Sequence, residues 1–166
     1  MSVPDKMRHY YPDAAWAVHG DTYEGLMWYG PGEKPTEAEL DALEWPAVTD
    51  DMVDAERDRR IANGFTFNGV RFQSRPEDRE NIAGAALAAL KSMVDGKGEG
   101  ELDWFPGVPA FAWIAEDNST VPMDAPTMFA LGEAAAAHKQ ALIFKARAIK
   151  DMDPTPADYA DDSYWT

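Results

Sequence analysis

The sequence predicts an α+β fold: a small helical domain with the order helix, hairpin, helix, hairpin, helix, preceded by an N-terminal β-hairpin and a short helix. Two observations lead to it. Apolar residues recur at helical spacing in stretches with well-marked ends, and tight-turn residues separate short aromatic strands between them. With 166 residues, 45% of them hydrophobic, the chain is long enough to enclose a core.

The N-terminal segment is expected to hold a hairpin and a short helix. Apolar side chains alternate over residues 15–29 around a Gly20-Asp21 break, which is typical of two paired strands. Residues 35–45 then begin with a proline and carry acids in the first turn, as helices often do. These features define an aromatic, acidic arm over residues 1–48 that we expect to dock onto other proteins.

The central segment, residues 49–151, contains the remaining predicted elements. Asn68-Gly69 is the preferred dipeptide of a type I′ turn and predicts a hairpin over residues 65–72. A second hairpin is expected around Asn118-Ser119. Three helices are predicted from their apolar spacing and end signals, at about residues 49–63, 76–94 and 126–150.

The C-terminal segment, residues 152–166, holds two prolines and several acids and ends in an aromatic pair and a threonine. This composition predicts an acidic flexible tail, because proline and like charges oppose regular packing.

Charge excludes several classes of partner. The formal net charge is −15, and 18 of the 30 acids lie in residues 1–56 and 151–166. An acidic surface repels phosphate, so we expect no direct binding to nucleic acid and no attachment to a membrane. The chain has no cysteine, which removes disulfides, thiolate metal sites and thiol nucleophiles.

No motif predicts catalysis, a bound metal or a cofactor. The three histidines, His9, His19 and His138, are far apart, and no second ligand follows at helical spacing. His138 falls on the apolar row of the last predicted helix, so we expect it to be at least half buried and to bind no metal. The prediction is therefore a protein that is not an enzyme.

Aromatic residues are the candidates for an interface, since tyrosine and tryptophan are enriched in binding hot spots. They crowd the arm and the end of the tail, and we expect both segments to be ordered chiefly by contact with other chains. The interface candidates are Tyr10, Tyr11, Trp16, Tyr23, Trp28, Tyr29, Trp45, Tyr164 and Trp165.

A second set of residues is expected to have structural roles in turns and packing. Small residues at 83–86 and 134–137 would let two helices approach closely, either within the chain or, as an alternative, between subunits. The structural candidates are Asn68, Gly69, Gly84, Trp113, Asn118 and His138.

Two long stretches resemble a known group of proteins. These are RDRRIANGFTFNGVRFQSRPEDRENIAGAALAAL at 57–90 and FAWIAEDNSTVPMDAPTMFALGEAAAAHKQALIFKARAIKD at 111–151. They are similar to an uncharacterised domain family found in proteins encoded beside the tail-fibre genes of tailed bacteriophages and prophages. The N-terminal segment resembles those that precede this domain in phage tail proteins. The family has no established catalytic residues.

This resemblance implies a structural component of a tailed bacteriophage virion, at the tail tip, baseplate or tail-fibre attachment region. Its partners would be other tail or fibre proteins, in several symmetry-related copies, and it would lie in the host cytoplasm during assembly. One alternative is a tail-fibre assembly chaperone that is absent from the mature virion. A further alternative is an acidic inhibitor of a host nucleic-acid enzyme, but residues 57–150 hold equal numbers of acids and bases, which argues against it. Another alternative is a cell-wall hydrolase, and the lack of a catalytic motif argues against that.

Overall fold

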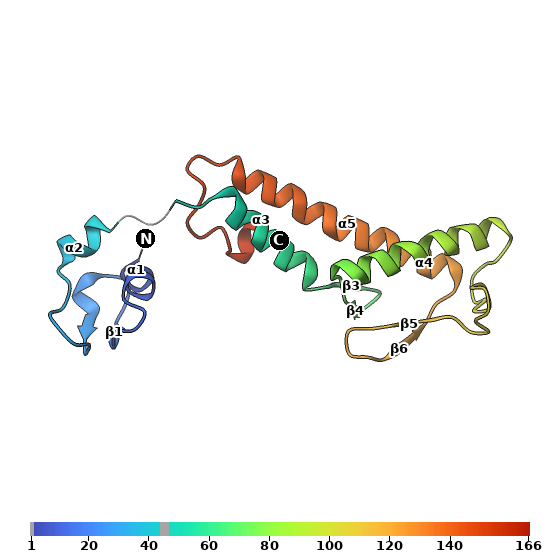
Figure 1. The fold of residues 1–166 in the computed structure, drawn as a ribbon, viewed down its shortest axis with the longest axis horizontal. Helices are drawn as coiled ribbons and strands as arrows, with labels where there is room; N and C mark the ends of the chain where they lie inside the picture. Colours follow the sequence, from blue (N-terminus) through green and yellow to red (C-terminus); the bar gives the residue numbers. More distant parts are fainter. Residues whose placement is uncertain (1, 44–46) are drawn as a thin grey trace. The chain divides into compact units, whose positions relative to one another are not determined.

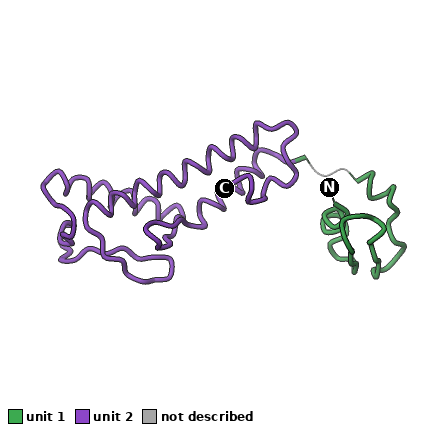
Figure 2. Tube along the Cα trace, turned by 180° about the vertical axis from the view of Figure 1, so that it is seen from behind, with its two compact units in different colours: residues 1–47 green, residues 48–166 purple. Residues whose placement is uncertain are grey.

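A computed structural model describes residues 2–43 and 47–166 (Figure 1). The chain forms two compact units, unit 1 over residues 1–47 and unit 2 over residues 48–166 (Figure 2). None of the helices in the described ranges has the length and apolarity needed to span a bilayer.

Unit 1 is a short hairpin with helical segments packed on it. Its elements are α1 (Val3–Tyr10), β1 (Trp16–Val18), the 3-10 helix η1 (Tyr23–Gly25), β2 (Leu26–Trp28) and α2 (Glu37–Ala42). The two strands are antiparallel, with Trp16 opposite Trp28. Met7, Leu26 and Leu40 form the buried centre, one each from α1, β2 and α2.

Local signals explain where the helices of unit 1 begin. Thr36 and Glu39 form a capping box at the start of α2, in which each side chain accepts a hydrogen bond from the backbone N–H of the other. Pro4 lies in the first turn of α1, where its missing N–H costs nothing.

Unit 2 is built along one long helix. Its elements are α3 (Asp50–Ala62), β3 (Phe65–Phe67), β4 (Val70–Phe72), α4 (Pro76–Val94), β5 (Ala112–Ile114), β6 (Thr120–Pro122), α5 (Ala125–Lys150) and the 3-10 helix η2 (Asp162–Tyr164). Asp124 caps α5 by accepting a hydrogen bond of 2.8 Å from the N–H of Thr127.

α5 packs against α4 along its first half and against α3 along its second half, which produces two buried clusters (Figure 1). Its contact with α4 is close, because a Cβ added to Gly132 would lie 2.5 Å from the Cβ of Ala86. Ala85 and Ala135, one from each small-residue stretch, are buried in the same cluster, so the two stretches pack within the chain, which was the first of the two predicted alternatives.

The hairpin at residues 65–72 is confirmed. β3 and β4 pair with Phe65 opposite Phe72. Asn68 and Gly69 have φ values of 49° and 78°, the left-handed conformation that a type I′ turn requires at both central positions.

The predicted overall architecture is wrong. The described residues form five α-helices and three separate two-stranded antiparallel sheets, a mixed α+β fold whose order does not match the predicted hairpin and helix bundle. The prediction began with the hairpin over residues 15–29, whereas a helix, α1, precedes that hairpin. α1 has only eight residues, of which Met7 alone is fully buried, so its packing against Leu26 and Leu40 is what stabilises it.

The structure also differs from the predicted flexible tail, since residues 152–166 are packed within unit 2. Trp165 is only 4% exposed and lies in the cluster formed by α3 and α5. The expected repulsion between acidic segments is offset locally. Arg60 forms an ion pair of 2.7 Å with Asp162, and the Nζ of Lys145 donates a hydrogen bond of 2.6 Å to the carbonyl of Trp165.

Candidate functional site

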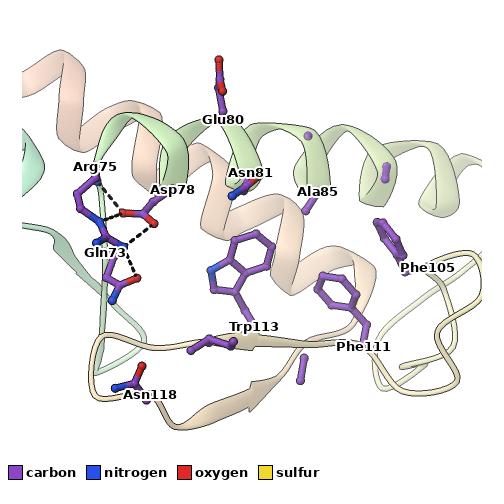
Figure 3. Close-up of a pocket in the computed structure, with 14 residues that line it drawn as sticks. Gln73, Arg75, Asp78, Glu80, Asn81, Ala85, Phe105, Phe111, Trp113 and Asn118 are labelled. Atoms are coloured by element: carbon purple, nitrogen blue, oxygen red, sulfur yellow. Dashed lines mark hydrogen bonds and ion pairs between the residues drawn. The ribbon is translucent and has the colours of Figure 1, made fainter.

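Unit 2 has a groove between α4 and β5 with a volume of about 810 Å³ (Figure 3). Small residues of α4, namely Gly84, Ala85 and Ala88, form one wall. The opposite wall is the β5 segment from Phe111 to Ile114, and Phe105 and Asn118 lie toward the two ends.

An aromatic cluster supports the β5 side of the groove. The ring of Phe111 lies 4.4 Å from that of Trp104 and 5.2 Å from that of Phe105, measured between centroids. Trp104 is fixed in turn, because its Nε1 donates a buried hydrogen bond of 2.8 Å to the carbonyl of Met123. The wall is therefore anchored to the core of unit 2.

Trp113 lies in the groove itself. Its ring projects from β5 toward α4, where Asn81 lies above it (Figure 3). Trp113 is only partly buried and Asn81 is exposed, so an aromatic surface and a side-chain amide are both accessible. A partly exposed tryptophan next to a hydrogen-bonding group is characteristic of binding surfaces.

One end of the groove is polar. The Nε of Arg75 donates to Asp78 at 2.8 Å, and Nη2 donates to the Oε1 of Gln73 at 3.2 Å. Hydrogen bonding to the Arg75 guanidinium holds the pKa of Asp78 below its ordinary value. Asp78 is therefore ionised at neutral pH and is a poor proton donor.

The groove thus presents apolar surface and hydrogen-bonding groups, and its arrangement suits binding better than acid-base chemistry. Among the described residues, no group of three or more His, Asp or Glu side chains is placed to hold a metal ion.

Most interface candidates in the arm contribute to unit 1 itself. Tyr11, Trp16, Tyr23 and Trp28 are partly buried around its apolar centre, so α1 and α2 supply the second surface that these rings were expected to find on other chains. Tyr10 is also partly buried.

The other interface candidates lie in different environments. Tyr29 is 65% exposed and is the most accessible aromatic ring among the interface candidates that the structure describes. Tyr164 is partly buried and Trp165 is buried, both in unit 2. Trp45 lies outside the described residues. The candidates from the arm and the tail thus belong to two different units.

The structural candidates occupy turns, the groove and a helix contact. Asn118 has a φ of 65° in the turn between β5 and β6. Gly84 is exposed and lines the groove. A Cβ added to it would meet nothing within 4 Å. It is Gly132 that makes the close helix contact predicted for this kind of residue.

His138 is mostly buried, as predicted, and its ring stacks on Phe65 with centroids 5.7 Å apart. Its Nε2 is buried and has no hydrogen-bond partner among the described residues. Burial lowers the pKa of His138 from its ordinary value of 6.5, and the positive charges of Arg71 and Lys145 act in the same direction. The backbone of Arg60 and of Ile61 opposes the shift.

This shift predicts a pH dependence of stability. Since the folded pKa lies below 6.5, the unfolded chain takes up the proton first as the pH falls. The contribution of neutral His138 to the stability of the fold is therefore present above pH 6.5. It is lost as the pH falls toward the pKa of His138 in the folded protein. We expect the unfolding free energy of the wild type to fall as the pH is lowered below 6.5, and to fall less in His138→Gln.

Urea denaturation at several pH values measures this difference. His9 and His19 remain in both proteins, so the comparison isolates His138. Parallel pH profiles for the two proteins would contradict the prediction.

Sequence reasoning missed most of the groove. Among its residues, only Gly84, Trp113 and Asn118 were singled out, each as structural. Asn81, Phe105 and Phe111 were not, because they come together only when the β5-β6 hairpin folds back along α4. A usable signal was the polar residue Asn81 close to the small-residue stretch at 83–86.

Comparisons with known proteins define the family and nothing further. Neither the curated proteins nor the solved structures gave a match to this chain. One family matches residues 46–164, which include all of unit 2, from α3 through η2, except residues 165 and 166. The chain therefore belongs to DUF4376, a family described as a domain of unknown function.

Proposed function

We propose that this protein is a structural component of a tailed bacteriophage virion, at the tail tip, baseplate or tail-fibre attachment region, where it acts through protein-protein contacts. The phage context is supported by the resemblance of residues 57–90 and 111–151 to domains in phage tail and tail-fibre-region proteins. Its partners would be other tail or fibre proteins, and it would be present in several symmetry-related copies.

The observation that carries the contact role is the groove between α4 and β5. It combines the accessible ring of Trp113 with the amide of Asn81, while Asp78, the groove acid held by Arg75, stays ionised. These features favour recognition of another protein over catalysis. The net charge of −15 supports partners other than nucleic acid.

Quantitative mass spectrometry of purified, washed virions tests this proposal. We expect the chain at a fixed ratio of several copies per particle. Loss of the chain on washing, while the known tail proteins remain, would contradict a structural role.

A tail-fibre assembly chaperone is the second candidate, and the open groove favours it as well, because a transient partner needs an accessible site. This function predicts a chain that is absent from finished virions and that increases the solubility of the fibre protein when the two are co-expressed. The mass spectrometry experiment separates the two candidates.

A further inference from the structure

The backbone of β5 has one edge that pairs with β6 and one that does not. The carbonyl of Phe111 accepts a hydrogen bond of 3.1 Å from the N–H of Met123, and the N–H of Ala115 donates one of 2.9 Å to the carbonyl of Ser119. Successive residues of a strand direct these groups to opposite sides. Ala112 and Ile114 therefore direct their N–H and C=O groups away from β6.

This outer edge meets another strand at a single point. The N–H of Glu116 donates a hydrogen bond of 2.9 Å to the carbonyl of Arg71 in β4, and the two side chains form an ion pair of 2.7 Å. The chain then leaves β4 through Gln73 and enters α4. Among the described residues, nothing pairs with the outer backbone groups of Ala112 and Ile114, and both residues line the groove.

The two edges of the hairpin differ in their chemistry. At the outer edge of β6, Pro122 lies opposite Ala112 and has no N–H to offer. Proline at an edge is one way in which proteins prevent a further strand from pairing. The edge of β5 carries no such block, so it retains the donors and acceptors that another strand requires.

We propose that the groove binds an extended peptide segment of a partner protein, which pairs as an added strand with the outer edge of β5. The inference rests on the proposed function in that both need a protein partner. The backbone groups of Ala112 and Ile114 would hold the main chain of the segment. Trp113 would contact an apolar side chain, and Asn81 would offer a further hydrogen bond.

The opposite wall decides which kind of chain fits. α4 lies across the groove from β5, so we expect a single extended segment to enter, whereas the hairpin of a second copy would arrive with its own α4 attached. The occupant is therefore a strand without its own sheet, such as a terminus or a loop of a partner.

The probe for this site is a short peptide of alternating valine and threonine with a lysine at each end, titrated to millimolar concentration into the full-length protein. We expect NMR shifts at the amides of Ala112 and Ile114 and at the indole N–H of Trp113, together with slower hydrogen exchange of the two amides. Shifts confined to other residues, or no shifts at all, would overturn the proposal.

A matched pair of variants tests the backbone contact. Ala112→Pro removes the outward N–H but no hydrogen bond to β6, and Ala112→Val keeps that N–H at the same exposed position. We expect Ala112→Pro to weaken peptide binding by about tenfold or more and Ala112→Val to leave it nearly unchanged. Equal binding by both variants would contradict strand pairing.

A second measurement covers the case in which Ala112→Pro does not fold. The same peptide, N-methylated at alternate residues, is titrated into the wild-type protein and should bind about tenfold more weakly. Undiminished binding would overturn the proposal. Self-association of the wild type that Ala112→Pro abolishes would also overturn it, since a second copy would then occupy the edge.

These outcomes are separate from the test of the proposed function. A chain that binds the peptide but is absent from virions would retain the groove as a strand-binding site and lose the virion role. A chain present in virions that does not bind the peptide would show the reverse.

Discussion

Replacing Gly64 with valine is expected to lower the free energy of unfolding of unit 2 by about 3 kcal/mol. Gly64 has a φ of +90°, which a β-branched residue adopts only with strain. A Cβ there would also lie 2.5 Å from the carbonyl oxygen of Phe72. Phe72 is 1% exposed and paired in β4, so its backbone has little room to move.

Gly69→Val is the matched control. Gly69 has a φ of +78°, but a Cβ there would meet nothing within 4 Å, so the substitution adds turn strain without a steric clash. We expect it to cost on the order of 1 kcal/mol or more, through turn strain alone. Urea denaturation followed by helical circular dichroism measures both variants, since α3, α4 and α5 all belong to unit 2. Equal losses would show that the contact with Phe72 relaxes at little cost.

The comparison of these glycines shows what the sequence could predict. The turn at Gly69 depends on two adjacent residues, and Asn68-Gly69 is enough to predict it. The helix that ends just before Gly64 was predicted at about residues 49–63, from equally local signals. The close approach of Gly64 to Phe72 depends on how β4 folds back against the end of α3, and no local pattern records that.

The same distinction explains the helix ends. Thr49 and Asp124 cap α3 and α5 through hydrogen bonds to the first turn, and the helices that they start were predicted at about residues 49–63 and 126–150. α4 was predicted at about residues 76–94 and spans Pro76–Val94, with Arg75 just before its first turn. There the carboxylate of Asp78 accepts a hydrogen bond from the N–H of Arg75.

Two parts of the molecule could not be predicted because they depend on contacts between distant segments. α1 is held by Met7 against Leu26 and Leu40, and neither partner is close to it in sequence. The groove requires β5 to lie along α4 with its outer edge unpaired. The composition led us to expect that aromatic rings in the arm would make the contacts with other proteins. The accessible tryptophan in the groove is instead Trp113, in unit 2.

The position of the tail leads to the second large effect. Trp165→Ala is expected to lower the free energy of unfolding of unit 2 by about 3 to 5 kcal/mol. The ring is buried against α3 and α5, its Nε1 donates a hydrogen bond of 2.7 Å to the carbonyl of Tyr159, and the guanidinium of Arg60 lies 5.0 Å from its centroid. Truncation removes these contacts and leaves a cavity.

Tyr164→Ala is the control, because it removes an adjacent aromatic ring from the same acidic segment. Tyr164 is only partly buried, and its hydroxyl bonds to Asp158 at the surface, so we expect a loss of about 1 kcal/mol. Denaturation of both variants, with hydrogen exchange at the C-terminal end of α5, distinguishes a packed tail from a loose one. If Trp165→Ala were as stable as the wild type, the tail would contribute nothing to unit 2, and its tryptophan would again be a candidate for docking onto other chains.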